Sequence, residues 1–119
     1  MNWLLVFIGG GLGSVLRFAI SRLFLSFEFS LFPIATLLAN VFSTTLVGII
    51  ALRFLVPSSS LSYYFLVIGF CGGFSTFSTF SLETFQLIKN GHLFWAGINV
   101  IFSVLLCLFL LYLISKSIK

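Results

Sequence analysis

One asparagine and three hydroxyl residues share a face of an apolar stretch in the first half of the chain. Thr36, Asn40, Ser43 and Thr44 follow the i, i+4, i+7, i+8 spacing of a helix face. The Asn40 amide carries two N–H donors, which could replace water around a small anion. Asn, Ser and Thr also hydrogen-bond between membrane helices, so the spacing leaves two alternatives open, a pore face and an interhelical contact.

Phe77 and Phe80 are three residues apart and share a face wherever their segment is helical. The edge of a phenylalanine ring is electropositive, so ring edges can lie against an anion without holding it as tightly as a full cation would. The chain has 17 phenylalanines, and packing against lipid or other helices is the simpler interpretation of any one of them. The pair therefore supports an anion path only together with other features.

Glycine, serine and threonine alternate with phenylalanine from Gly69 to Ser81. Glycine weakens helices, and Ser/Thr hydroxyls compete for backbone carbonyls. The pattern predicts a helix break from Gly72 to Ser75 at mid-membrane depth, which lipid tolerates only where the backbone is buried in protein or lines a cavity. Carbonyls at a break are hard ligands for a small cation such as Na⁺. A kink filled by hydroxyl groups is the alternative.

Arg17 and Glu83 are charged residues within predicted spans. A charge at the bilayer centre costs at least ~2.5 kcal/mol, so each is a candidate functional residue. Both side chains can instead extend to the membrane interface. Arg17 in a water-filled vestibule would attract anions, and Glu83 near its mouth would oppose that attraction unless it pairs with a cation.

Asn99, Ser103 and Cys107 repeat at i, i+4 steps and form a thin polar stripe on the last apolar segment. Helix–helix contacts are the alternative to a pore-lining role for this stripe. The sequence contains no catalytic triad, phosphate loop or metal-hydrolase motif, so we expect no enzymatic activity.

The composition determines which elements must position these residues. The chain is 61% hydrophobic and 7% charged, whereas soluble domains carry about 25% charged residues. A membrane helix needs roughly 20 apolar residues, so 119 residues allow about four spans with short connections. We predict an all-α membrane protein with one domain over residues 1–119 and spans at about 3–25, 32–56, 62–89 and 93–114. No basic cluster is present, so nucleic acid is not an expected partner.

Short polar or helix-breaking stretches separate the predicted spans. The expected loops are Ser26 to Leu31, Pro57 to Ser60, and Asn90 to His92. Within the first span, Gly9 and Gly13 have the small-xxx-small spacing that lets two helix backbones approach closely.

The few charges give almost no preferred orientation in the membrane. With a cytoplasmic N-terminus, Arg53, Lys116 and Lys119 lie on the cytoplasmic side, and Arg22 and Lys89 lie on the other. Because Lys and Arg set orientation, either orientation is expected, and so is insertion in both.

Three stretches of the chain together resemble the fluoride channel family known as Fluc or CrcB. They are GGLGSVLR at residues 10–17, TLLAN at 36–40, and GFCGGFSTFSTFS at 69–81, which is followed by Glu83. The resemblance covers nearly the whole chain, and the third stretch is its most specific part.

The resemblance implies a fluoride-specific channel built as an antiparallel dimer of four-helix subunits with two pores, which exports fluoride passively across the cell membrane. It implies that the pore is lined by Asn40, Phe77, Thr79, Phe80 and Ser103. It also implies a vestibule with Arg17 and Glu83, and a structural Na⁺ at the dimer interface, held by the backbone carbonyls of Gly72 and Ser75. The expected pattern at the fourth-helix stripe is rich in hydroxyls, and this chain departs from it at Asn99 and Cys107.

Two alternatives remain beside a homodimeric channel. A small multidrug transporter is also a four-helix antiparallel dimer, but it needs an acidic residue in its first helix, where this chain has Arg17 and Arg22. A non-conducting partner subunit of a heterodimeric channel is the second alternative, because some family members occur as two unlike, oppositely oriented subunits.

Overall fold

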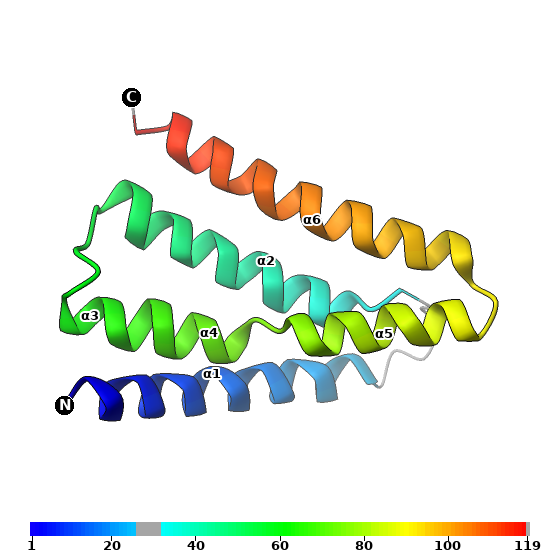
Figure 1. Cartoon of the computed structure of the whole chain (residues 1–119), viewed down its shortest axis with the longest axis horizontal. Helices are drawn as coiled ribbons and strands as arrows, with labels where there is room; N and C mark the ends of the chain where they lie inside the picture. The colour runs from blue at the N-terminus through cyan, green and yellow to red at the C-terminus, as the bar shows by residue number, and fades with distance from the viewer. Residues whose placement is uncertain (26–31, 119) are drawn as a thin grey trace.

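Four long apolar helical segments, arranged side by side, make up the described part of the chain (Figure 1). The computed structural model describes residues 1–25 and 32–118. The first segment is α1 (Asn2–Leu25), and the second is α2 (Ile34–Gly48), continued by the π-helical η1 (Ile49–Arg53). The third comprises α3 (Leu61–Tyr63), the π-helical η2 (Tyr64–Cys71), α4 (Gly72–Phe74) and α5 (Phe77–Lys89), and the fourth is α6 (Leu93–Lys116). All four are long and apolar enough to cross a membrane, which confirms the prediction of four apolar helices.

Polar side chains lie inside the bundle, and large apolar side chains face outward. Asn99 is 1% exposed and Ser43 is 2% exposed, whereas Trp3 is 89% exposed and Phe7 is 77% exposed. This distribution suits lipid, which offers the buried hydrogen-bonding groups no partner and accepts the apolar surface without penalty. The chain is a multi-pass membrane protein.

Two extended residues interrupt the third segment between α4 and α5. Ser75 (φ −75°, ψ 156°) and Thr76 (φ −153°, ψ 118°) are extended. The prediction placed a break from Gly72 to Ser75, but Gly72 to Phe74 are helical here. The last helical bond of this half runs from the Ser75 N–H to the Cys71 carbonyl, at 2.9 Å. Both backbone groups of Thr76 bond to the Asn40 side chain, and these bonds hold the extended pair in place. Glycine flexibility alone would not fix its position.

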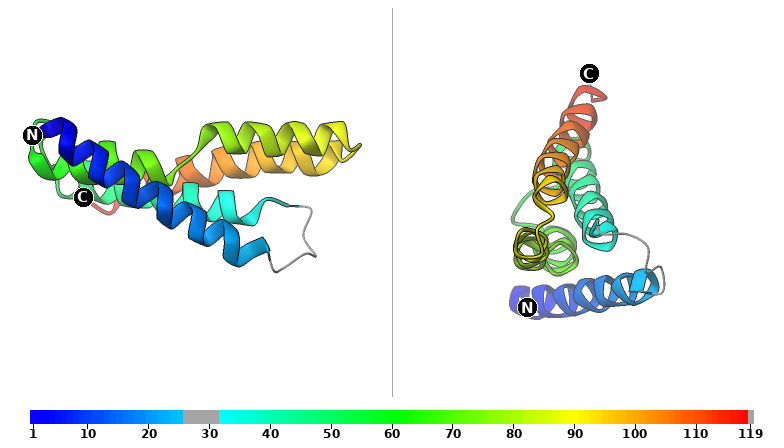
Figure 2. Two further views of the ribbon diagram at one scale, coloured as in Figure 1. Left: turned by 90° about the horizontal axis from the view of Figure 1, so that it is seen from below. Right: turned by 90° about the vertical axis from the view of Figure 1, so that its right-hand side faces the viewer.

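Glycines bring α1 into backbone contact with η2 and α4. A Cβ on Gly9 would lie 2.3 Å from the Phe65 carbonyl oxygen, and one on Gly13 would lie 2.2 Å from that of Phe70. The predicted close approach at Gly9 and Gly13 is confirmed, with the third segment as the partner. Farther along, α1 diverges from α5 (Figure 2).

α2 lies beside α6, and α5 also packs on α6. The N-terminus, the C-terminus and the turn before α3 lie at one end of the bundle, and the turn after α5 lies at the other (Figure 1). That second turn contains Gly91 at φ +82°, a left-handed conformation that favours glycine. The predicted first loop lies outside the described residues.

Candidate functional site

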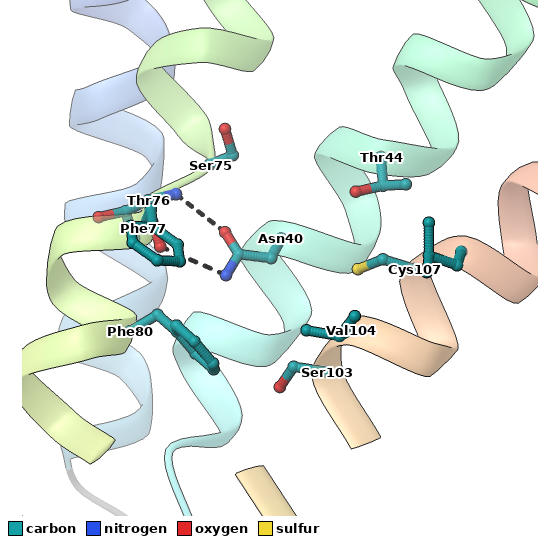
Figure 3. Close-up of a pocket in the computed structure, with 10 residues that line it drawn as sticks. Asn40, Thr44, Ser75, Thr76, Phe77, Phe80, Ser103, Val104 and Cys107 are labelled. Carbon is teal, nitrogen blue, oxygen red and sulfur yellow. Dashed lines mark hydrogen bonds between the residues drawn. The ribbon is translucent and has the colours of Figure 1, made fainter. Parts of the chain in front are cut away.

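Asn40 joins α2 to the extended residues of the third segment (Figure 3). Its Oδ1 accepts a 2.8 Å hydrogen bond from the Thr76 N–H, and its Nδ2 donates to the Thr76 carbonyl at 3.4 Å. The amide therefore satisfies both backbone groups of a residue that has left the helix, where unpaired groups would be costly. One N–H of Asn40 remains for a ligand, because an amide nitrogen carries two hydrogens.

Thr76 also begins α5. Its Oγ1 accepts a hydrogen bond from the Thr79 N–H at 3.2 Å, as an N-cap side chain does, and donates to Thr79 Oγ1 at 3.0 Å. Thr76 was not among the predicted site residues. A threonine directly before a resumed helix is the usual N-cap signal, and it would have placed the start of α5 at Phe77.

A pocket of about 350 Å³ adjoins Asn40 and the extended residues. Asn40, Phe77, Phe80 and Ser103, four of the five predicted pore residues, line it (Figure 3). Its remaining lining residues are Thr44, Ser75, Thr76, Val104, Cys107 and Leu108. The site thus combines amide and hydroxyl groups with aromatic and aliphatic walls from α2, α5 and α6.

The two phenylalanines form one edge of this pocket. Their ring centroids are 5.9 Å apart and the ring planes are tilted by 38°. Phe77 is 80% exposed, whereas Phe80 is partly buried. A single chain therefore does not enclose the pocket on the Phe77 side.

Thr79 and Arg17 lie away from the pocket and next to each other. Arg17 Nη1 donates to Thr79 Oγ1 at 3.5 Å, and Arg17 Nε donates to the Gly73 carbonyl at 3.2 Å. The guanidinium thus bridges α4 and α5 across the extended pair, where its charge also suits the carbonyl end of α4. The roles of Thr79 in the pore and of Arg17 in a vestibule stay predictions.

Glu83 lies one turn farther along α5, at a second pocket of about 450 Å³ lined also by Ser21 and Pro33. Its Oε1 accepts a 2.9 Å hydrogen bond from the Thr36 hydroxyl. Its Oε2 is buried and has no hydrogen-bond partner among the described residues. The structure therefore places Glu83 apart from the pocket at Asn40, and its vestibule role stays a prediction.

The polar stripe of α6 divides into two parts. Ser103 and Cys107 line the pocket at Asn40, but Asn99 is not among its lining residues. Asn99 Nδ2 instead donates to Thr84 Oγ1 at 2.9 Å, and its Oδ1 accepts from the Ser103 hydroxyl at 3.3 Å. The stripe thus makes a helix contact at Asn99 and lines the pocket at Ser103 and Cys107, where pore lining stays a prediction. The sequence analysis missed Thr84.

Gly72 and Ser75 line a further pocket of about 280 Å³, together with Ser43 and Cys71. Gly72 is exposed, and a Cβ built there would come no closer than 4.0 Å to the Val67 carbonyl oxygen. Because the Thr76 N–H bonds to Asn40, the Gly72 carbonyl lacks the donor that a continuous helix would supply. Within residues 1–25 and 32–118, no group of three His, Cys, Asp or Glu side chains could hold a metal.

Comparison with known proteins adds to this geometry. The family described as "CrcB-like protein, Camphor Resistance (CrcB)" matches residues 4–114. A protein of Coxiella burnetii (strain Dugway 5J108-111), named "Fluoride-specific ion channel FluC", is 45% identical over 111 residues, which cover 91% of this chain and 90% of the relative. A protein of the same name from Pyrococcus abyssi (strain GE5 / Orsay) is 43% identical over 112 residues, covering 92% and 89%.

A third relative, from Azobacteroides pseudotrichonymphae genomovar. CFP2, carries the same name and is 46% identical over 91 residues, covering 74% of this chain and 72% of its own length. The match to the family model spans all four helical segments, including the pocket residues on α2, α5 and α6. This chain therefore belongs to the CrcB family.

Proposed function

We propose that this chain is a subunit of a fluoride-specific ion channel that lowers cytoplasmic fluoride by passive export. The observation that carries the proposal is the pocket in which Asn40, Phe77, Phe80 and Ser103 meet beside the extended residues of the third segment. The names of the relatives supply the ion, since the geometry by itself suggests only a small anion. These names also support a channel rather than an enzyme, and they give no support to a small multidrug transporter.

The physical chemistry of the pocket suits a small, strongly hydrated anion. Removing water from fluoride is costly unless hydrogen-bond donors replace it, and the remaining N–H of Asn40 is such a donor. Electropositive ring edges of Phe77 and Phe80 add weaker attraction. Among the residues that the structure describes, no lysine or arginine lines the pocket. Weak attraction without a full cation lets an ion both enter and leave, as conduction requires.

The working unit is an antiparallel dimer. The 80% exposure of Phe77 leaves the pocket incomplete, and a second subunit would close it. The near absence of charge bias lets identical chains insert in opposite orientations. The partner is a second copy of this chain or a homologous, oppositely oriented subunit, and the complex resides in the cell membrane.

A structural Na⁺ fits this dimer at the exposed face of Gly72. The backbone carbonyls of Gly72 and Ser75 from each subunit would hold it, and carbonyl oxygens are ligands that Na⁺ prefers. The exposed Gly72, whose carbonyl lacks its helical donor, supports this assignment. The ion would supply positive charge beside these carbonyl oxygens.

Fluoride efflux from liposomes that contain only this protein tests the proposal. We expect fluoride efflux and no chloride efflux above that of protein-free liposomes. An absence of fluoride efflux would contradict the homodimeric channel. If efflux then appears on adding a second, similar subunit, the chain is half of a heterodimer.

A further inference from the structure

Four polar groups form a continuous chain of hydrogen bonds from the pocket into the contact between α6 and α5. The Ser103 hydroxyl bonds to Asn99 Oδ1 at 3.3 Å, and Asn99 Nδ2 bonds to Thr84 Oγ1 at 2.9 Å. The Thr84 hydroxyl bonds to the carbonyl oxygen of Phe80 at 2.7 Å. Asn99, Ser103 and Thr84 are 1%, 6% and 9% exposed. Ser103 alone of these three side chains lines the pocket (Figure 3).

The Phe80 carbonyl, at the inner end of this series of hydrogen bonds, fixes the direction of each bond in the series. A backbone carbonyl only accepts, so Thr84 must donate its single hydrogen to Phe80. Thr84 Oγ1 can then only accept, and the amide nitrogen of Asn99 is the one group of that side chain that can donate to it. The amide oxygen of Asn99 consequently faces Ser103, so the Ser103 hydroxyl must donate its hydrogen away from the pocket.

This direction decides what Ser103 offers to the pore. Its hydroxyl has one hydrogen, which it donates to Asn99 Oδ1. Only the lone pairs of the Ser103 oxygen therefore face the pocket. Fluoride is an acceptor and gains nothing from lone pairs, whereas a water molecule can donate to them. Asn99 and Thr84 themselves do not touch the pocket, and they act through Ser103.

We infer that Asn99 and Thr84 are positioning residues that hold Ser103 as an acceptor, so that Ser103 binds a water molecule beside fluoride and not fluoride itself. The inference rests on the proposed channel function and assigns roles within the same site. The bond from the Ser103 hydroxyl to Asn99 Oδ1 is 3.3 Å long and is the longest of the three hydrogen bonds. Loss of Asn99 or of Thr84 leaves the Ser103 hydroxyl free to donate its hydrogen into the pocket.

The test measures fluoride flux against fluoride concentration in liposomes. Thr84→Val keeps the side-chain shape and removes the anchor, so the Asn99 amide can rotate and donate to Ser103. Asn99→Leu removes the acceptor directly. In both variants Ser103 can donate to fluoride, and we expect the half-saturating fluoride concentration to fall by about two- to tenfold, the range of one net hydrogen bond.

Double variants separate this effect from a general change in packing. In a Ser103→Ala background no hydroxyl is left to turn, so neither substitution should shift the half-saturating concentration further. Thr45→Val is the matched control. Its hydroxyl also bonds to the carbonyl four residues earlier, that of Val41 at 2.8 Å, but it lines a different pocket and continues into no such chain.

Two results would overturn the inference while leaving the channel function intact. One is an unchanged half-saturating fluoride concentration in both single variants, after size-exclusion chromatography has shown that both are folded. The other is a shift that persists in the Ser103→Ala background. If the unsubstituted protein carries no fluoride, the proposed function fails and the positioning roles fail with it.

Discussion

At the scale of single residues, Asn40 has a structural task and a proposed conduction task, which use different atoms of one amide. Its oxygen and one N–H hold the backbone of Thr76, and its other N–H is available to the pocket. A leucine in its place would leave the Thr76 N–H buried without a partner, at a cost of about 1–3 kcal/mol. The structural task and the conduction task are therefore separable by substitution.

Asn40→Asp separates them. The carboxylate still accepts from the Thr76 N–H but cannot donate to the Thr76 carbonyl, so we expect thermal stability in detergent between that of Asn40→Leu and that of the unsubstituted protein. It adds negative charge to the anion pocket, so fluoride flux should fall by about tenfold or more. Asn40→Leu should lower both stability and flux. Equal flux in Asn40→Asp and the unsubstituted protein would show that Asn40 is an interhelical contact only.

Phe80 offers a second residue-scale prediction. Phe80→Ile keeps an apolar wall but removes the electropositive ring edge, so fluoride flux should fall by about tenfold while the subunits still assemble. The control is Phe85→Ile, since Phe85 is 60% exposed on the same helix and lies outside the pocket. Full flux in Phe80→Ile would identify Phe80 as a packing residue.

At the scale of elements, the close contact of α1 with η2 and α4 depends on glycines, which have no side chain. A Cβ on Gly73 would lie 2.3 Å from the Gly10 carbonyl oxygen, and one on Gly13 would lie 2.2 Å from that of Phe70. In each case the obstructing atom is backbone and cannot move aside without separating the helices. The same contact places Arg17 against the Gly73 carbonyl.

Gly13→Ala should therefore lower the melting temperature in detergent, with a loss of about 1–3 kcal/mol from overpacking. Gly11 is the matched control, because a Cβ there meets nothing within 4 Å. Gly11→Ala should be neutral or stabilise by about 0.5–1 kcal/mol, as alanine favours a helix. Equal melting temperatures for the two variants would mean that α1 does not pack as described.

At the scale of the whole molecule, the proposed homodimer requires two orientations of one chain. The turn with Ser58 and Ser59 lies at the end of the bundle that holds both termini, and the turn with Asn90 lies at the opposite end (Figure 1). Basic residues added to one end should bias all chains to one orientation and remove antiparallel pairs.

Ser58→Lys combined with Ser59→Lys should therefore reduce fluoride flux from cells or liposomes several-fold. Co-expression with an oppositely biased variant, such as Asn90→Lys, should restore it. A reporter fused to the C-terminus should be found on both sides of the membrane for the unsubstituted chain and on one side for the double variant. A single orientation of the unsubstituted chain would argue for a separate partner subunit.

The sequence alone determined the four apolar spans and their approximate limits. Length and local composition fix where a chain can cross a membrane, so predicted spans such as 93–114 differ little from α6 at Leu93–Lys116. The spacing of Gly9 and Gly13 likewise predicted a close helix contact, because only small residues let two helix backbones approach each other.

Only the tertiary structure decided what holds the extended pair in place and what each polar residue faces. Asn40 and Thr76 are 36 residues apart, and their hydrogen bonds hold the extended pair at Ser75 and Thr76, so that only Ser75 of the predicted break from Gly72 to Ser75 is extended. Asn99 and Ser103 lie on one face of α6, yet Asn99 bonds to Thr84 on α5, whereas Ser103 lines the pocket. Periodicity shows which residues share a face of a helix, but only the packed neighbours determine what that face meets.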